Sequence, residues 1–308
     1  MTAEPAWDGY LADPFVLRLP DGGYAAYGSG PPADATTSGP RVFRALWSAD
    51  LRGWEDRGHV LERMPPAAGD EYWAPEVAWA DGGYWLYYSV GHGIDGHAVR
   101  VARADAPFGP FVDTGSVLTR GERFAIDAHP FLDVDGRRYL FYARDVLDHP
   151  RPGTHLAVVP LDGPASPAGP PVAVLAPFAD WQVYARDRPM YGGRYDWHTL
   201  EGPFVVRRLG RYWMTYSGGA WTGSGYAVSW AVADHPLGPW APAPASAPPL
   251  LATGDDLVGP GHNSVVVAPD GADVIAFHSW DALGTRRQMR LHRFEVTPRG
   301  PVVVLPLA

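Results

Sequence analysis

The feature that most constrains the fold of this chain is a pattern that recurs five times. In each copy an apolar stretch, opened by a polar or acidic residue beside a proline or glycine, leads through a tight turn into an aromatic-rich strand. The copies run from Asp13 to Tyr27, from Pro75 to Tyr88, from Asp127 to Tyr142, from Glu201 to Tyr216 and from Gly261 to His278. Their openings are 62, 52, 74 and 60 residues apart, which leaves room for four short strands per copy. This period predicts radially arranged β-sheets, a five-bladed β-propeller.

The second copy shows how one blade is built. Pro75–Trp79 and Tyr84–Ser89 flank a glycine-containing turn, which is the signature of a β-hairpin because glycine supplies the positive φ of tight turns. A third strand is expected at Ala98–Arg103 and a fourth near Phe111. Similar connections follow in other copies, so we expect each copy to form a four-stranded sheet.

Composition supports an all-β fold in one domain. The 308 residues include 36 Gly, 33 Pro, 13 Trp, 15 Tyr and 11 Phe. Glycine and proline both disfavour helix interiors and concentrate in turns. Because the five copies fill nearly the whole chain, we expect residues 1–308 to form a single domain.

Charge and terminal sequence restrict partners and compartment. A net charge of −9 argues against nucleic-acid or anionic-membrane partners, which require a basic surface. The chain has no cysteine and therefore no disulfide framework or thiol nucleophile. The N-terminal residues lack a secretory signal and no stretch is apolar enough to span a bilayer. We expect a cytoplasmic protein, or a secreted one if a leader has been removed; the sequence does not determine the oligomeric state.

Several polar residues are predicted to meet at one mouth of the propeller. The first strand of each blade lies innermost, so the residues at its start converge near the axis. Three carboxylates occupy such positions, Asp13, Asp127 and Glu201, together with His262, and Trp73 lies just ahead of another opening. Gathering like charges is costly, and such clusters are typical of functional sites.

Facing carboxyl groups suit the hydrolysis of glycosidic bonds. One carboxylic acid protonates the leaving oxygen, and the other carboxylate activates water when the two are about 6.5 to 9.5 Å apart or attacks directly at about 5 to 5.5 Å. The acid must stay protonated near neutral pH, which a neighbouring carboxylate favours. Sequence does not give the separation.

The motifs at these openings resemble those of glycoside hydrolase family 43, the five-bladed propeller enzymes that act on arabinose- and xylose-containing polysaccharides. They are Ala12-Asp13-Pro14, Trp73-Ala74-Pro75-Glu76, Ala125-Ile126-Asp127, Glu201-Gly202-Pro203 and Gly261-His262-Asn263-Ser264. The resemblance implies that Asp13 is the general base, that Glu201 is the general acid and that Asp127 raises the pKa of the acid and orients it. It also implies inversion of the anomeric configuration. Many members carry an appended β-sandwich, which we do not expect here.

Further residues are candidates for binding. The resemblance implies an arginine in the site, for which Arg287 is the choice over a solvated position, and a histidine near the axis, His262, associated with a hydrated calcium ion or with the active site. Trp73 and Trp221 are candidates for stacking on sugar, with blade packing as the alternative for both. No cofactor is required for the chemistry; a structural calcium ion on the axis is a further expectation.

Three polar neighbours of these residues are treated separately. Glu76 is expected to make structural hydrogen bonds. His129 and His198 remain unassigned, because successive residues of a strand point to opposite faces.

The sequence therefore predicts an enzyme that hydrolyses arabinose- or xylose-containing oligosaccharides or polysaccharides, most simply an exo-acting α-L-arabinofuranosidase. A β-xylosidase and an endo-1,5-α-L-arabinanase are the alternatives within the family. A sugar-binding propeller without catalysis is the alternative from another class.

Overall fold

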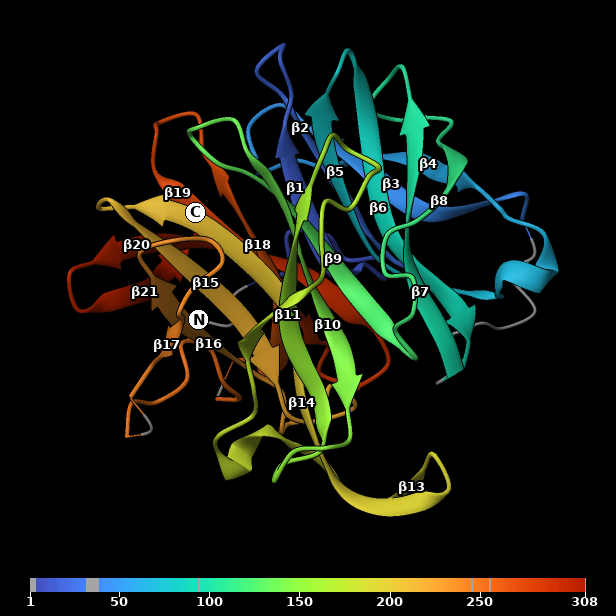
Figure 1. The fold of residues 1–308 in the computed structure, drawn as a ribbon. Helices are drawn as coiled ribbons and strands as arrows, with labels where there is room; N and C mark the ends of the chain where they lie inside the picture. The colour runs from blue at the N-terminus through green and yellow to red at the C-terminus, as the bar shows by residue number, and fades with distance from the viewer. Residues whose placement is uncertain (1–3, 32–38, 94, 245, 255, 308) are drawn as a thin grey trace.

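The computed structural model describes residues 4–31, 39–93, 95–244, 246–254 and 256–307, and its regular structure is almost all β. Consecutive strands form antiparallel four-stranded sheets, each of which is a blade (Figure 1). Blade 1 consists of β1 (Ala12–Arg18), β2 (Tyr24–Ser29), β3 (Arg41–Ser48) and β4 (Glu55–Glu62). Blade 2 follows the short 3₁₀ helix η1 (Pro66–Ala68) and consists of β5 (Glu71–Ala80), β6 (Gly83–His92), β7 (Asp95–Ala104) and β8 (Val112–Val117).

The remaining blades repeat this order with one elaboration. Blade 3 consists of β9 (Ala125–Leu132), β10 (Arg138–Val146), β11 (Gly153–Leu161) and β12 (Val172–Leu175). Blade 4 is preceded by the 3₁₀ helix η2 (Asp180–Gln182) and β13 (Val183–Met190), and consists of the C-terminal half of β14 (Gly193–Arg208), β15 (Arg211–Gly218), β16 (Ala227–Ala233) and β17 (Ala241–Pro242). Blade 5 consists of β18 (Val258–Val267), β19 (Asp273–Trp280), β20 (Arg287–Thr297) and β21 (Gly300–Pro306).

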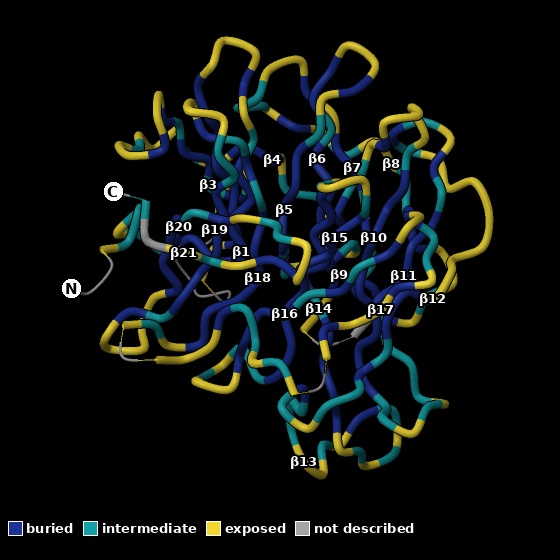
Figure 2. Tube along the Cα trace, turned by 90° about the vertical axis from the view of Figure 1, so that its left-hand side faces the viewer, coloured by how far each residue is buried: buried dark blue, intermediate teal, exposed yellow. Residues whose placement is uncertain are grey.

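The five blades form a closed ring. The innermost strands contact one another in the order β1, β5, β9, β14, β18 and back to β1. The two ends of the described chain bond to the same strand of blade 5, because the N–H of Ala6 donates to the carbonyl of Met289 and the N–H of Leu307 donates to that of Leu291. Figure 2 shows both ends on one side of the molecule, with buried segments along the strands and exposed ones at the loops. The predicted five-bladed β-propeller is confirmed.

Each innermost strand is bulged at the same place. The pairing with the second strand of the blade shifts register at one equivalent point of each innermost strand, and one residue there has a left-handed backbone. These residues are Asp13, Ala74, Asp127, Gly202 and His262, with φ between 47° and 60°. A left-handed residue other than glycine costs about 1–3 kcal/mol and persists where its surroundings fix it. In blades 2, 4 and 5 the left-handed residue therefore lies one position away from the residue at which the sequence copy was taken to open.

A ring of hydrogen bonds ties these bulges together. The backbone N–H of each left-handed residue donates to a side chain of the preceding blade. Three of the acceptors are serine hydroxyls, Ser29 for Ala74, Ser89 for Asp127 and Ser217 for His262. The other two are ionisable: Asp127 Oδ2 accepts from Gly202, and His278 Nδ1 accepts from Asp13. At these two positions, Asp127 and His278, an ionisable side chain takes the place of the serine that the other blades use.

Aromatic side chains from the second strands fill the spaces between blades. Tyr27, Tyr88, Tyr142 and Tyr216, the residues that close four of the sequence copies, are all buried. Each buries roughly 150–250 Å². The packing of these rings explains why an aromatic recurs at this point of the repeat.

Blades 3 and 4 share a continuous sheet. The strand β11 pairs in parallel with β14 through Gly153 and Thr154 opposite His198 and Thr199. A Cβ at Gly153 would lie 1.9 Å from the carbonyl oxygen of His198, so only glycine permits this approach. The N-terminal half of β14 continues past the blade and pairs with β13, forming a hairpin that the repeat did not predict. Figure 1 shows β13 projecting from one end of the molecule.

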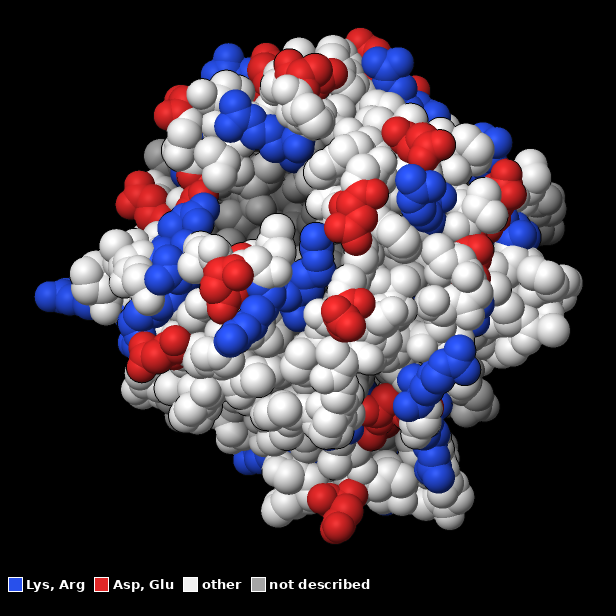
Figure 3. Space-filling model, turned by 45° about the horizontal axis from the view of Figure 1, so that its top comes forward, with Lys and Arg blue, Asp and Glu red and all other residues white. Residues whose placement is uncertain are grey.

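The opposite end of the propeller carries the turns that follow the innermost strands. Figure 3 looks toward this end and shows acidic and basic side chains interspersed. Ion pairs join the blades or their strands here, including Arg208 with Asp273 at 2.6 Å and Arg293 with Asp270 at 2.7 Å. Within the described residues, no helix has the length and apolar character needed to cross a membrane.

Candidate active site

The structure brings together the four polar residues predicted at the axis. Asp13, Asp127 and His262 are left-handed bulge residues of blades 1, 3 and 5, and Glu201 immediately precedes the one in blade 4. The Nδ1 atom of His262 lies 3.5 Å from Oδ1 of Asp13 and 3.7 Å from Oδ2 of Asp127. Asp13, Asp127 and His262 are buried, whereas Glu201 is partly exposed. Because the bulges redirect side chains toward the axis, residues from four blades form one cluster.

Asp13 sits in a positively charged environment. Its Oδ1 accepts a hydrogen bond from Nη1 of Arg287 at 3.3 Å. Burial alone would raise the pKa of Asp13, but the charges of Arg287 and then His262 outweigh it and hold the pKa well below its usual range. His278 is neutral, because its Nδ1 accepts the backbone N–H of Asp13 and burial lowers its pKa to about 4. Asp13 therefore tends to be ionised at neutral pH.

Aromatic rings hold Arg287 in place. Its guanidinium lies 4.5 Å from the Trp221 ring centroid and 6.0 Å from that of Trp280, and the two indoles stack with an interplanar angle of 14°. Its Nε donates to the hydroxyl of Tyr10. Arg287 is thus in the cluster, as expected from the sequence, and Trp221 contacts the arginine and remains partly exposed at the mouth.

Asp127 and His262 form the centre of the cluster. Burial raises the pKa of Asp127 above its ordinary value. The charge of His262 opposes this rise, and the charge of Asp13 adds to it. Burial lowers the pKa of His262, but Asp127, Asp13 and Glu201 together raise it above its ordinary value. His262 thus tends to carry a proton and to balance the carboxylates. Asp127 Oδ2 also accepts the N–H of Gly202 at 2.9 Å, which fixes the backbone beside Glu201.

Glu201 has the opposite environment to Asp13. Burial and then the charge of Asp127 raise the pKa of Glu201 above its ordinary value, so it tends to keep its proton at neutral pH. The hydroxyl of Tyr226 donates to Glu201 Oε1 at 2.6 Å. A Cβ at Gly261 would lie 1.9 Å from the Tyr226 ring, so glycine at 261 makes room for this tyrosine. The second carboxyl oxygen of Glu201 accepts no hydrogen bond within the described part of the chain.

Trp73 and Glu76 lie beside the cluster with different contacts. The Trp73 ring stacks on His97 with centroids 3.7 Å apart and remains partly exposed. Glu76 Oε2 accepts a hydrogen bond from Nδ1 of His129 at 2.8 Å, while His129 Nε2 accepts the N–H of Val205. These bonds join blades 2, 3 and 4, so Glu76 has the structural role that was expected. The same bonds give His129, which the sequence left unassigned, a structural role.

A calcium ion held by His262 finds no matching donor set in the described residues. No group of three or more histidine, cysteine or acidic side chains there has a metal-binding arrangement. The Nδ1 atom of His262 faces two carboxylates and the pKa of the ring is raised, which favours a proton on the ring rather than a vacant lone pair. Calcium also prefers oxygen ligands. Calcium therefore enters no step proposed below.

Three residues of the cluster were not predicted from the sequence: Tyr226, His278 and Tyr10. They contact Glu201, Asp13 and Arg287 respectively. Tyr226 follows a glycine-rich loop and Tyr10 lies ahead of the first strand, outside the motifs. Of the three, only His278 occupies a position of the repeat, the end of the fifth copy. That position was the one feature of the sequence that could have indicated a residue of the cluster. The ring of His278 stacks on that of Tyr226 with centroids 5.7 Å apart.

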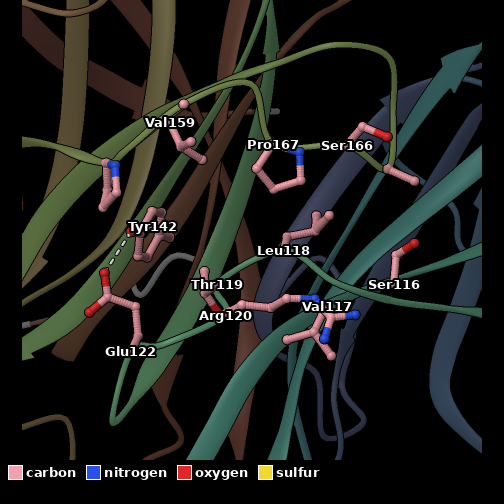
Figure 4. Close-up of a pocket in the computed structure, with 13 residues that line it drawn as sticks. Ser116, Val117, Leu118, Thr119, Arg120, Glu122, Tyr142, Val159, Ser166 and Pro167 are labelled. Atoms are coloured by element: carbon pink, nitrogen blue, oxygen red, sulfur yellow. Dashed lines mark hydrogen bonds between the residues drawn. The ribbon is translucent and has the colours of Figure 1, made fainter.

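A separate hollow of about 460 Å³ is found elsewhere in the chain; Figure 4 shows the residues that line it. It is lined by residues 116–120 and Glu122, by Tyr142 and Val159, and by part of the 165–171 loop, and none of the axial residues lines it. Figure 4 shows Glu122 bonded to the Tyr142 hydroxyl at its edge. The chemistry of the carboxylate cluster therefore does not extend into this hollow.

Comparison with known protein families gives a match to Glycosyl hydrolases family 43 over residues 2–302. The chain is similar to a β-D-galactofuranosidase of Aspergillus niger, with 31% identity over 93% of this chain and 79% of the relative. It is also similar to an extracellular exo-α-(1→5)-L-arabinofuranosidase of Streptomyces chartreusis, with 29% identity over 87% of this chain and 79% of the relative. The chain spans about half of some relatives, such as 54% of α-L-arabinofuranosidase 43 of Humicola insolens, which is 26% identical over 87% of this chain.

Among solved structures, the crystal structure of a thermostable family-43 glycoside hydrolase matches with a TM-score of 0.84 and 28% identity. The match covers 99% of this chain and 96% of that one. Because the match covers nearly all of both chains, all five blades take part in it.

Proposed function

The chain belongs to glycosyl hydrolase family 43, and on that premise we propose that it is an inverting, exo-acting α-L-arabinofuranosidase. Membership of the family makes the protein a glycoside hydrolase acting on arabinose- or xylose-containing sugars. The sugar, the mode of attack and the roles of individual residues are the proposal.

One observation carries the proposed mechanism. Two carboxyl groups at one mouth of the propeller, Asp13 and Glu201, have environments that move their pKa values in opposite directions. Asp13 is held ionised by Arg287, whereas Glu201 is held protonated by burial and Asp127. A general base and a general acid require these two states at the same pH.

The proposed reaction uses both groups in one step. Water attacks the anomeric carbon and passes a proton to the Asp13 carboxylate as the bond between the anomeric carbon and the glycosidic oxygen breaks. Glu201 gives its proton to that oxygen, so the leaving sugar departs as a neutral alcohol. Asp13 then loses its proton to solvent and Glu201 regains one. Attack by water on the face opposite to the leaving group inverts the anomeric centre.

The surrounding residues would prepare this pair. Asp127 raises the pKa of Glu201 and holds the adjacent backbone through Gly202. Tyr226 occupies one oxygen of Glu201 and leaves the other for the glycosidic oxygen. Trp73 and Trp221, both partly exposed near the cluster, are the proposed surfaces for stacking of sugar rings.

The choice of arabinofuranose is supported by the relatives. Curated relatives that align with 87% of the chain include arabinofuranosidases of Humicola insolens, Streptomyces avermitilis and Streptomyces chartreusis. The exo mode is supported by the words exo-α-(1→5) in the names of the two Streptomyces relatives.

A second candidate is β-D-galactofuranosidase activity. The relative with 31% identity carries this name. α-L-Arabinofuranose and β-D-galactofuranose have matching ring stereochemistry and differ in the exocyclic chain, so one pocket could accept both. β-Xylosidase and endo-arabinanase activities stay as further candidates within the family.

The test is hydrolysis of the p-nitrophenyl glycosides of α-L-arabinofuranose, β-D-galactofuranose and β-D-xylopyranose by the intact protein. We expect the arabinofuranoside to have the highest kcat/KM, and the first-formed product seen by NMR to be the inverted anomer. A retained anomer would contradict the assigned roles of Asp13 and Glu201. A higher kcat/KM on another of these glycosides would replace arabinofuranose by that sugar as the proposed substrate. Binding of sugar without turnover would favour a sugar-binding propeller without catalysis.

A further inference from the structure

We propose that the β13–β14 hairpin, through Tyr184 and Arg188, forms a subsite for the sugar unit on the leaving-group side of the cleaved bond. The ligand is a neutral pentose or hexose unit of an oligosaccharide. This inference rests on the proposed function, because a leaving-group side exists only where glycosides are cleaved.

The hairpin is joined directly to the proposed acid. The strand β14 runs without interruption from the hairpin into blade 4 and carries Glu201 in its middle. At the base of the hairpin, Val183 pairs with His198, three residues before Glu201. Because a strand advances about 3.3 Å per residue, the base of the hairpin lies about 10 Å along β14 from Glu201. Arg188 pairs further out, with Tyr195, and its guanidinium extends back over the ring of Tyr184.

Several contacts anchor the hairpin to blade 3 and its loops. The hydroxyl of Tyr191 donates to Asp145 Oδ2 at 2.5 Å, and the guanidinium of Arg123 lies 4.5 Å from the Tyr191 ring centroid. At the base, Arg151 forms an ion pair with Asp180 at 2.9 Å. An element held at both ends can position a ligand.

The three arginines of the hairpin have different surroundings. Arg186 pairs with Asp196, and Arg194 pairs with Asp187, both on the exposed surface. Arg188 has no ion-pair partner in the described part of the chain. Its guanidinium lies 4.7 Å from the ring centroid of Tyr184 and 5.6 Å from that of the buried Trp197.

A β-bulge produces this difference. Ala185 pairs with Trp197 and Arg188 pairs with Tyr195, so two residues of β13 stand opposite Asp196. One of them, Asp187, has a left-handed backbone with φ of 50°. Without the bulge Arg188 would share the face of Arg186, because side chains alternate along a strand. The bulge places the Arg188 donors beside an aromatic face instead.

Tyr184 completes the proposed subsite. Its side chain is partly exposed, and its hydroxyl has no recorded hydrogen-bond partner among the described residues. Burial raises the pKa of Tyr184, the charge of Arg188 opposes this rise and the charge of Glu201 adds to it. An aromatic face, a hydroxyl and a guanidinium fork with free donors suit the apolar face and the hydroxyl groups of a sugar.

The experiment compares two substrates that differ on the leaving-group side. For Arg188→Ala we expect kcat/KM to fall about tenfold on a linear arabino-oligosaccharide. On the p-nitrophenyl glycoside the fall should be at least fivefold smaller, because this substrate has no sugar hydroxyl groups on the leaving-group side. Tyr184→Phe keeps the ring and should lower the oligosaccharide value about threefold. Arg186→Ala, on the exposed surface of the same hairpin, is the matched control and should change neither substrate. Equal losses on both substrates, or the same loss in the control, would overturn the subsite.

A binding measurement separates this proposal from the proposed function. In a Glu201→Gln background, which cannot donate the proton, calorimetric titration with arabinotriose should give a Kd about tenfold weaker when Arg188→Ala is added. A Kd unchanged by Arg188→Ala would reject the subsite. Failure of the unaltered protein to hydrolyse any glycoside would reject the proposed function instead, and the titration would still decide whether the hairpin binds sugar.

Discussion

The surroundings of Asp13 and Glu201 differ although both residues lie at the bulges of equivalent innermost strands, Asp13 at the left-handed residue and Glu201 just before it. Asp13 is buried against a guanidinium and a histidine that tends to be protonated, and its pKa is depressed. Glu201 faces a second carboxylate and one neutral hydroxyl, and its pKa is raised. The repeat brings a carboxyl group to the axis from each blade concerned. The neighbours supplied by the other blades then decide whether that group is ionised, so the proposed base and acid differ in their environments.

The largest test of this comparison removes each carboxyl group in turn. We expect Asp13→Ala to lower kcat about 10³-fold on every substrate, because no leaving group replaces a base that activates water. Glu201→Gln should lower kcat by about the same factor on an oligosaccharide. On the p-nitrophenyl glycoside the loss in kcat should be at least tenfold smaller, because this leaving group needs little protonation. Steady-state kinetics on both substrates measure this. If both variants showed the same dependence on the leaving group, the two roles would not be distinct.

The next test changes the acid side through its neighbour. In Asp127→Asn the amide oxygen still accepts the Gly202 N–H, but the charge that raises the pKa of Glu201 is lost. The basic limb of the kcat/KM profile should therefore move to lower pH, with about a hundredfold loss at pH 8. A pH series in constant ionic strength measures the limb. A loss of rate without this movement would mean that Asp127 acts only by position.

The corresponding test on the base side uses Arg287. Without the guanidinium the pKa of Asp13 should rise, so that the acidic limb of the profile moves to higher pH and activity near pH 4 falls about tenfold in Arg287→Met. Arg286→Met is the matched control, because this neighbouring arginine pairs with Asp281 and not with Asp13. Movement of the acidic limb in the control as well would indicate a general charge effect.

A smaller effect is expected from Tyr226. Its hydrogen bond favours the ionised form of Glu201, so Tyr226→Phe should raise the pKa of Glu201 further and move the basic limb to higher pH, with a loss in kcat of about fivefold. Gly261→Ala should lower activity through the same contact, because the new Cβ would displace the tyrosine ring. A basic limb that moved downward in Tyr226→Phe would show that the bond favours the protonated acid.

The smallest effect concerns stability. A carboxyl group whose folded-state pKa is raised binds more protons in the folded than in the unfolded state, so stability falls as pH rises from the unfolded value of about 4.3 toward the folded value. Glu201→Gln removes this dependence, and its Tm should exceed that of the unaltered protein by a few degrees at pH 9 but not at pH 4. Asp13→Asn should lower Tm at both pH values, because the pKa of Asp13 is depressed and the stabilisation by its ionised form is lost only as pH falls below the unfolded value toward the folded one. Thermal unfolding at the two pH values measures both; identical curves for the two variants would remove the distinction between their surroundings.

Much of the fold was predictable because the same local sequence pattern recurs in every blade. The turn glycines, the prolines and the aromatic that closes each copy are local requirements of a hairpin packed between blades, and Tyr27, Tyr88, Tyr142 and Tyr216 are buried as that pattern requires. The β13–β14 hairpin was not predicted, since it interrupts the repeat. The excess length of the 74-residue step was the only sign of it.

The sequence by itself determined that the chain is an all-β propeller and that Asp13, Asp127, Glu201 and His262 lie at the axis, because position within a repeat fixes position in a ring. Tertiary structure decided the rest. Arg287 contacts Asp13 across 274 residues of sequence, and Tyr226 reaches Glu201 from a loop outside every motif. A bulge turns side chains by a local change of backbone that alternation does not reveal. Ionisation depends on burial and on charges within a few ångströms, and those distances exist only once the five blades have closed.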